Sequence, residues 1–177
     1  MRLAGLLALL LAVVLPATQP ARVKIARGAL TTMESSFDVR LTKLSQDDPF
    51  DLLGNTRGVY LEGYGAVFTT ELNLIVTPSI TPFRPSISKA DADKVHQRKL
   101  QKLPVLKRAM RDMLIASAAA LDKLPADEQV VLAVTLFYYS WEDRAGLPSQ
   151  VVLQAPKNAL LQGAGRVPDA AFRVEEL

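Results

Sequence analysis

The sequence of 177 residues contains no cysteine and a single histidine, His96. Disulfides, thiolate metal sites and sites built from several imidazoles are therefore excluded. The longest apolar run, Leu3 to Leu15, is shorter than the ~20 residues that a membrane-spanning helix needs. We expect an apolar core to stabilise the chain, without a metal ion or any other cofactor.

Net charge is also small, because 21 basic residues stand against 18 acidic ones and leave a net charge of +3. Proteins that bind DNA or RNA neutralise phosphates with a strong positive surface. The near balance of charge therefore argues against a nucleic-acid partner.

The start of the chain has the pattern of a secretory signal. Arg2 precedes the apolar run, which Pro16 and Ala17 close. A basic residue followed by a short apolar stretch is typical of a signal peptide. The sequence predicts a signal peptide over residues 1–21, cleaved between Ala17 and Ala21, and export to the periplasm or the exterior.

Two later segments space their apolar residues by three and four positions, as amphipathic helices do. The first covers residues 29–44. The second covers residues 91–124, with Ser88 or Asp91 as its cap, and Pro104 predicts either a kink or two consecutive helices. We expect the apolar second half of this segment to be buried and the charged first half to be exposed. The charged residues of the first half include Lys94, Arg98, Lys99 and Lys102.

Residues 57–76 are rich in strand-forming residues, and Gly63 and Gly65 interrupt them. Glycine adopts the positive φ of a tight turn without strain, which predicts a hairpin with strands near 57–62 and 66–76. A single long strand with a glycine bulge is the alternative.

Residues 129–139 form an apolar run without alternation, which predicts a central strand covered on both faces. After a turn at 142–148, residues 149–154 predict its hairpin partner. We expect one helical turn at 157–161 and a flexible tail over residues 163–177.

The resulting order is helix, strand, strand, helix, strand, strand. The economical fold for this order is an α+β two-layer sandwich, with a mainly antiparallel four-stranded sheet and the helices on one face. We expect residues 22–162 to form a single domain.

At YLEGYGAVF, residues 60–68, and at LFYYSWEDRAGLPSQVVLQAPK, residues 136–157, the chain resembles exported bacterial proteins that are known only as uncharacterised. The resemblance implies a secreted domain family. It implies no catalytic residue and no ligand.

Aromatic residues near strand ends are the best binding candidates, because they bury a large area at low entropic cost. Tyr64 lies between the two glycines of the predicted turn, and Trp141 lies just past a predicted strand. The sequence therefore predicts Tyr64 and Trp141 as surface residues that bind a partner.

The titratable residues form no comparable pattern. His96 has charged neighbours, as a solvated helix residue does. Asp47, Asp48 and Asp51 lack the spacing of an EF-hand and are ordinary loop residues, so no metal ligand is predicted.

No residue is predicted as catalytic either, since no sequence rule brings Glu62 to Glu71, or Glu142 to Asp143, at a working separation. The basic segment 94–111 could approach anionic lipid, but acidic residues dilute it, so membrane-surface contact is the weaker expectation.

We therefore expect an exported, non-enzymatic domain that binds a protein or another envelope component. The alternative is a cofactor-free secreted hydrolase, in which a hydroxyl, His96 and a carboxylate converge from distant positions.

Overall fold

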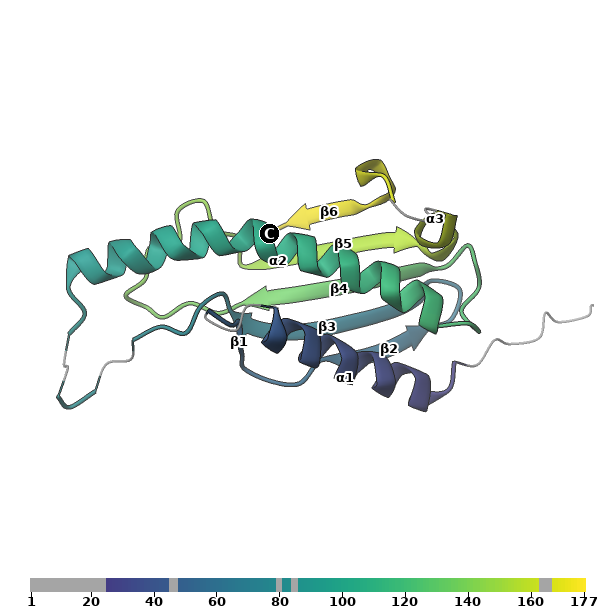
Figure 1. The fold of residues 1–177 in the computed structure, drawn as a ribbon, viewed down its shortest axis with the longest axis horizontal. Coiled ribbons are helices and arrows are strands. Elements are labelled where there is room, and N and C mark those ends of the chain that lie inside the picture. The colour runs from purple at the N-terminus through teal and green to yellow at the C-terminus, as the bar shows by residue number, and fades with distance from the viewer. Residues whose placement is uncertain (1–24, 45–47, 79–80, 84–85, 163–166) are drawn as a thin grey trace, which may run out of the picture.

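The computed structural model describes residues 25–44, 48–78, 81–83, 86–162 and 167–177. In these ranges three helices pack against a mixed, open sheet of six strands, so the fold is α+β (Figure 1). The predicted signal peptide, residues 1–21, lies outside the described residues. Within them, no helix is both long enough and apolar enough to cross a membrane.

The regular elements follow one another along the chain as α1 (Arg27–Lys43), β1 (Asp51–Leu52), β2 (Arg57–Leu61), β3 (Gly65–Asn73), α2 (Lys89–Ala120), β4 (Gln129–Leu136), β5 (Gln150–Pro156), α3 (Lys157–Gln162), the 3-10 helix η1 (Asp169–Ala171) and β6 (Arg173–Glu176). Across the sheet the order is β1, β3, β4, β5, β6. β2 also pairs with β3, beyond the end of β1.

The predicted hairpin is confirmed, with β2 and β3 antiparallel around a turn at Gly63 and Gly65. Both glycines have positive φ, 76° and 146°. A Cβ atom on Gly65 would lie 2.0 Å from the backbone oxygen of Gln129, because β3 starts directly against β4. Only glycine fits there, and the alternative of one long bulged strand is wrong.

The predicted number of four strands is wrong, since the sheet has six; four of its five pairings are antiparallel, as predicted for most of the sheet, and one is parallel. β3 and β4 are parallel, from the pair Gly65 and Gln129 to the pair Leu72 and Leu136. The chain returns along α2 between them and enters β4 in the direction of β3, as a strand–helix–strand crossover requires. The sheet also gains β1, inside a segment predicted as loop, and β6.

The prediction of a flexible tail over residues 163–177 is wrong where the tail is described, because Arg173–Glu176 forms the strand β6. It pairs antiparallel with β5, and the backbone of Leu177 continues the pairing through bonds with Gln150 of 3.0 and 3.2 Å. Phe172, just before β6, is 8% exposed and belongs to the core. Its burial anchors the strand. Residues 163–166 lie outside the described part of the chain.

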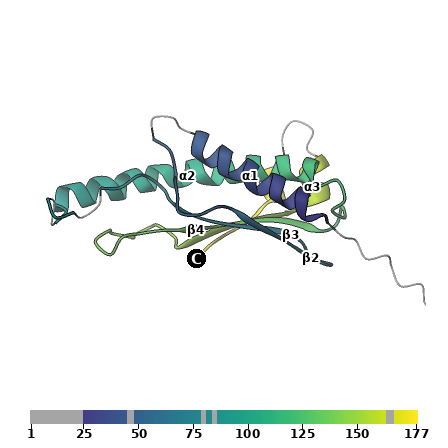
Figure 2. The same ribbon diagram turned by 90° about the horizontal axis from the view of Figure 1, so that it is seen from below.

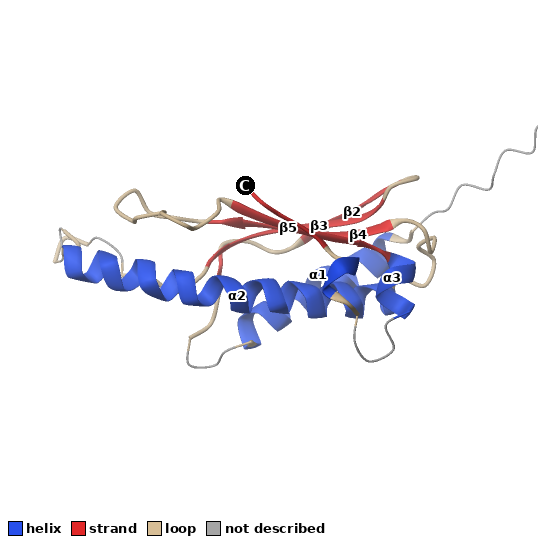
Figure 3. Ribbon diagram, turned by 90° about the horizontal axis from the view of Figure 1, so that it is seen from above, coloured by secondary structure: helices blue, strands red, loops and turns tan. Residues whose placement is uncertain are grey.

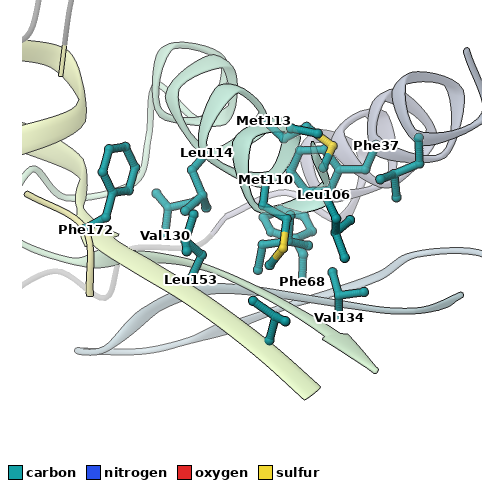
Figure 4. Packing of buried hydrophobic residues seen from close by; sticks show 14 of the residues in the cluster. Phe37, Phe68, Leu106, Met110, Met113, Leu114, Val130, Val134, Leu153 and Phe172 are labelled. Carbon is teal, nitrogen blue, oxygen red and sulfur yellow. The ribbon is translucent and has the colours of Figure 1, made fainter. Parts of the chain in front are cut away.

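All three helices lie on one side of the sheet (Figures 2 and 3). Alternate residues of the strands point toward them and form the core with α1 and α2 (Figure 4). Phe37 of α1 meets Phe68 of β3 edge to face, with ring centroids 5.0 Å apart. The strand residues of this core include Ala66, Phe68, Val130, Leu132, Val134, Val151 and Leu153.

α2 is one continuous helix, so the alternative of two consecutive helices is wrong although Pro104 lies within it. Ser88 caps its start, since the hydroxyl accepts the backbone N–H of Asp91 at 3.1 Å. No basic residue occupies its last turn. Instead, Lys157 donates to three carbonyls past the helix end, at 2.6 to 3.0 Å, where a cation is favourable.

Candidate binding face

One face of the sheet carries none of the helices in the described residues (Figure 3). Strand alternation and register place five valine and leucine side chains on this face, and Tyr64 of the β2–β3 turn reaches it through its bond to Gln154; we call this surface the open face. The five are Val59, Leu61, Val67, Val131 and Val152. The prediction that residues 129–139 are covered on both faces is therefore wrong, and Thr135, on the open side of β4, is exposed.

Tyr64 lies across this face. Its hydroxyl donates to Oε1 of Gln154 at 3.1 Å, and Gln154 belongs to β5. Since β4 separates β3 from β5, the side chain reaches over β4. This position accounts for the burial of Val131, which is 4% exposed on a face without helices.

Three neighbouring side chains remain well exposed. Val59 is 49% exposed, Leu61 45% and Tyr64 44%. Val59 pairs across the ladder with Val67, which pairs with Val131. The apolar part of the open face therefore runs over three adjacent strands.

Charged residues of both signs surround this apolar part. Arg57 and Glu71 lie on β2 and β3, while Arg173 and Glu175 lie on β6 and form an ion pair at 2.7 Å. The surface therefore has an apolar centre and a charge-balanced border.

The structure does not bring Tyr64 and Trp141 together. Tyr64 accepts a hydrogen bond from Gln129 at the start of β4, whereas Trp141 follows the end of that strand. The eight residues of β4 make seven steps of about 3.3 Å, which separates these ends by roughly 23 Å.

Trp141 is the last ring of a short aromatic series. Its ring stacks on Tyr139 at 5.8 Å, and Tyr139 meets Phe137 edge to face at 5.0 Å. Trp141 is half-buried, and its indole nitrogen is buried without a hydrogen-bond partner among the described residues. We assign it to the packing of the β4–β5 connection and keep Tyr64 as the candidate contact.

Of the four charged residues named in the first half of α2, Lys94 and Arg98 are exposed as expected, whereas Lys99 and Lys102 are buried, contrary to expectation. The ammonium of Lys99 forms an ion pair with Glu142, and the two side chains are 0% and 1% exposed. It also donates to the carbonyl of Phe137 at 3.2 Å and lies 4.6 Å from the ring centre of Tyr138. These contacts hold the β4–β5 connection against α2.

This cluster contains clear pKa shifts. Burial lowers the pKa of Lys99, against the opposing effect of Glu142. Burial also raises the pKa of Tyr138 to about 12, assisted by the negative charge of Glu142. Shifted groups often mark active sites, but the fully buried Lys99–Glu142 pair leaves no room for a substrate between its members. The cluster is therefore structural.

Lys102 is buried in the same way one turn later. Its ammonium lies 3.2 Å from the carboxylate of Asp48, contacts the Asp48 carbonyl and lies 5.1 Å from the ring centre of Phe50. Two of the cations that favoured lipid contact are thus used inside the molecule. The burial of both lysines could have been predicted from the sequence, because Lys99 and Lys102 occupy positions of the apolar stripe between Val95 and Leu106.

The remaining candidates do not converge. His96 approaches the backbone carbonyl of Asp143 at 3.0 Å, and no hydroxyl or carboxylate contacts its ring within the described ranges. Glu62 and Glu71 lie at opposite ends of the β2–β3 hairpin. In the part of the chain that the structure describes, no three potential metal ligands gather. Asp47 lies outside that part.

Comparison with known proteins adds no relative, since no family model, curated protein or solved structure matches the chain. The function must therefore be argued from the geometry of the open face.

Proposed function

We propose that this chain is an exported, non-enzymatic domain that binds another protein of the cell envelope through the open face. The observation that carries the proposal is the exposed group of Val59, Leu61 and Tyr64 on the sheet face that none of the described helices covers. Export rests on the signal-peptide pattern of residues 1–21.

The composition of the face favours a protein partner. Protein interfaces combine an apolar centre with a polar border, and tyrosine is enriched among their strongest contacts. Tyr64 is already oriented by its bond to Gln154, so little side-chain entropy is lost when a partner covers it.

The charges of the border argue against other partners. Anionic lipid and nucleic acid both require an excess of basic residues. Around the open face Arg57 and Arg173 are balanced by Glu71 and Glu175. Nothing in the border favours a polyanion.

No specific observation favours the hydrolase alternative. It requires a hydroxyl and a carboxylate in hydrogen-bond reach of the histidine. His96 instead approaches a backbone carbonyl.

Photo-crosslinking in the envelope tests the proposal. A photoreactive amino acid replaces Leu61 on the open face or, as the matched control, Val39 on α1, which is 48% exposed on the helix side. We expect Leu61 to give an adduct with a different protein and Val39 to give none. With that partner purified, Tyr64→Ala should weaken binding by about tenfold.

Several results would contradict the proposal. Equal yields of adduct at Leu61 and Val39 would mean that the partner does not bind preferentially to the open face. An adduct of twice the mass of the chain would indicate self-association, and crosslinking to lipid alone would indicate a membrane surface. Recovery of the full-length chain from the cytosol, with Met1 intact, would contradict export.

A further inference from the structure

The two outer edges of the sheet, β2 and β6, differ in whether their outward backbone groups are hydrogen-bonded. On β2, the outward N–H of Gly58 donates to Glu34 at 2.7 Å, and its carbonyl accepts from Arg27 at 2.7 Å. The N–H of Thr56, just before β2, donates to Asp38 at 3.0 Å. Side chains of α1 thus occupy the positions that a further strand would need.

The edge of β6 has no such cover. Gln150 and Leu177 exchange both backbone bonds, so alternation turns the N–H and C=O groups of Val174 and Glu176 away from β5. Among the described residues, no group hydrogen-bonds to these four backbone atoms. They are arranged to pair with another strand.

A groove of about 380 Å³ lies beside this edge, between α2 and β6. Leu153 and Val174 line it with apolar surface, and Lys107, Arg108 and Arg111 of α2 supply three positive charges.

Carboxylates neutralise only part of this charge. Lys107 pairs with Glu176 at 2.8 Å and Arg111 with Asp169 at 2.6 Å. Arg108 is exposed and has no ion-pair partner in the described ranges. The groove therefore keeps a positive excess.

We propose that the edge of β6 accepts an extended segment of a partner protein as an additional strand, and that this segment carries acidic side chains at alternate positions. Successive side chains of a strand point to opposite faces, so every second one would lie on the helix side, beside Arg108. This site is separate from the open face and does not depend on it.

The short, charged edge also explains why the added segment must be selective. Charged residues on an edge strand prevent pairing with apolar segments from other chains. β6 carries Arg173, Glu175 and Glu176, so its free backbone groups are available only to a strand whose charges match the groove.

A defined peptide tests the proposal. The probe is a fluorescent eight-residue peptide of alternating Glu and Thr, whose anisotropy is measured with the purified chain. We expect it to bind about tenfold more tightly than the same peptide with Lys in place of Glu. Methylation of alternate backbone nitrogens, which prevents strand pairing without changing charge, should weaken binding by at least about tenfold.

Two variants test whether the peptide binds at the edge of β6, beside Arg108. Val174→Pro removes an outward donor and no bond to β5, and Arg108→Glu reverses the unpaired charge; each should weaken binding by about tenfold. Arg40→Glu, on the exposed surface of α1, is the matched control and should leave binding unchanged.

Equal binding of the Glu and Lys peptides would overturn the acidic selectivity. Full binding of the methylated peptide would overturn strand addition, and this result does not depend on how well the Val174→Pro variant folds. If the Arg108→Glu variant binds the peptide as tightly as the parent does, the peptide does not lie in the groove beside Arg108.

Discussion

Lysine 99 shows how a single residue's environment can reverse its expected role. A buried ammonium is costly unless an anion and further acceptors surround it. Lys99 has the carboxylate of Glu142, the carbonyl of Phe137 and the ring face of Tyr138. Its charge is thus compensated within the protein, and its long aliphatic chain extends the apolar side of α2.

Replacing one member of this pair should be strongly destabilising. Lys99→Met leaves Glu142 buried without its counter-charge, so we expect a loss of about 3–5 kcal/mol in the free energy of unfolding, measured by urea denaturation at pH 7. Lys94→Met, at an exposed position of the same helix, should change it by less than about 0.5 kcal/mol.

The double variant separates charge from packing. Lys99→Met combined with Glu142→Gln removes both charges and keeps an acceptor for the backbone N–H of Tyr139, 3.2 Å from Glu142 in the parent, so it should recover most of the loss. If Lys99→Met alone costs less than about 1 kcal/mol, the ion pair is not desolvated in solution.

Tyr138 should make stability sensitive to alkaline pH. Its pKa is about 12 in the folded protein against 10.0 for an ordinary tyrosine. Below pH 10 both states keep the proton; between pH 10 and 12 the unfolded chain loses it first, so stability falls as pH rises through that window. In Tyr138→Phe this fall should be smaller, as measured by denaturation at pH 8 to 11.5.

The control for this variant is pH 7, where the titration plays no part. There Tyr138→Phe loses only the hydrogen bond to the carbonyl of Pro148, 2.8 Å in the parent, at a cost of about 1 kcal/mol. An alkaline fall as steep as that of the parent would show that another group is responsible.

At the scale of the elements, the contact of α1 with β2 shows how a helix protects the edge of a sheet from pairing with another chain. Glu34 is 5% exposed, and one of its oxygens accepts the N–H of Gly58 while Arg27 balances its charge. The helix thereby satisfies a strand edge that would otherwise pair with other chains.

Removing this contact should affect stability and association together. Glu34→Ala leaves the Gly58 N–H without an acceptor, which costs about 1–3 kcal/mol. It also uncovers the edge, so sedimentation should detect association that increases with concentration. Glu34→Gln keeps an acceptor oxygen and should lose less stability; if it associates as strongly as Glu34→Ala, the acceptor is not what protects the edge.

Local patterns were sufficient to predict α1, to favour the β2–β3 hairpin and to name Ser88 as one of two candidate caps of α2, since each depends on residues close in sequence. β6 was missed because Arg173–Glu176 contains two glutamates and follows a segment rich in glycine and proline. Its strand conformation comes from the ladder with β5 and the burial of Phe172, which no local pattern encodes.

At the scale of the whole molecule, the helices of the described residues cover the sheet on one side only. The apolar run of residues 129–139 predicted two covered faces, but Val131 is buried by its neighbours and by Tyr64 rather than by a second layer of helices. Sequence could propose Tyr64 as a surface residue from its glycines. It could not place Leu61 and Val59 beside it, because that depends on the register of three strands.

The two faces of the sheet should respond differently to truncation. Leu136 points to the helices and is 5% exposed, so Leu136→Ala should cost about 2–5 kcal/mol, a large part of the 5–15 kcal/mol of a typical domain. Tyr64→Ala, on the open face, should cost under about 1 kcal/mol.

Chemical denaturation followed by circular dichroism and by the fluorescence of Trp141, the one tryptophan in the chain, measures both effects. Because Tyr64 and Leu136 lie near opposite ends of β4, the double variant should lose the sum of the two values within about 0.5 kcal/mol, and both signals should report one transition. If Tyr64→Ala proves the more damaging change, its ring is needed to hold β3, β4 and β5 together. In that case the open face is part of the core, and a partner cannot bind there without competing with folding.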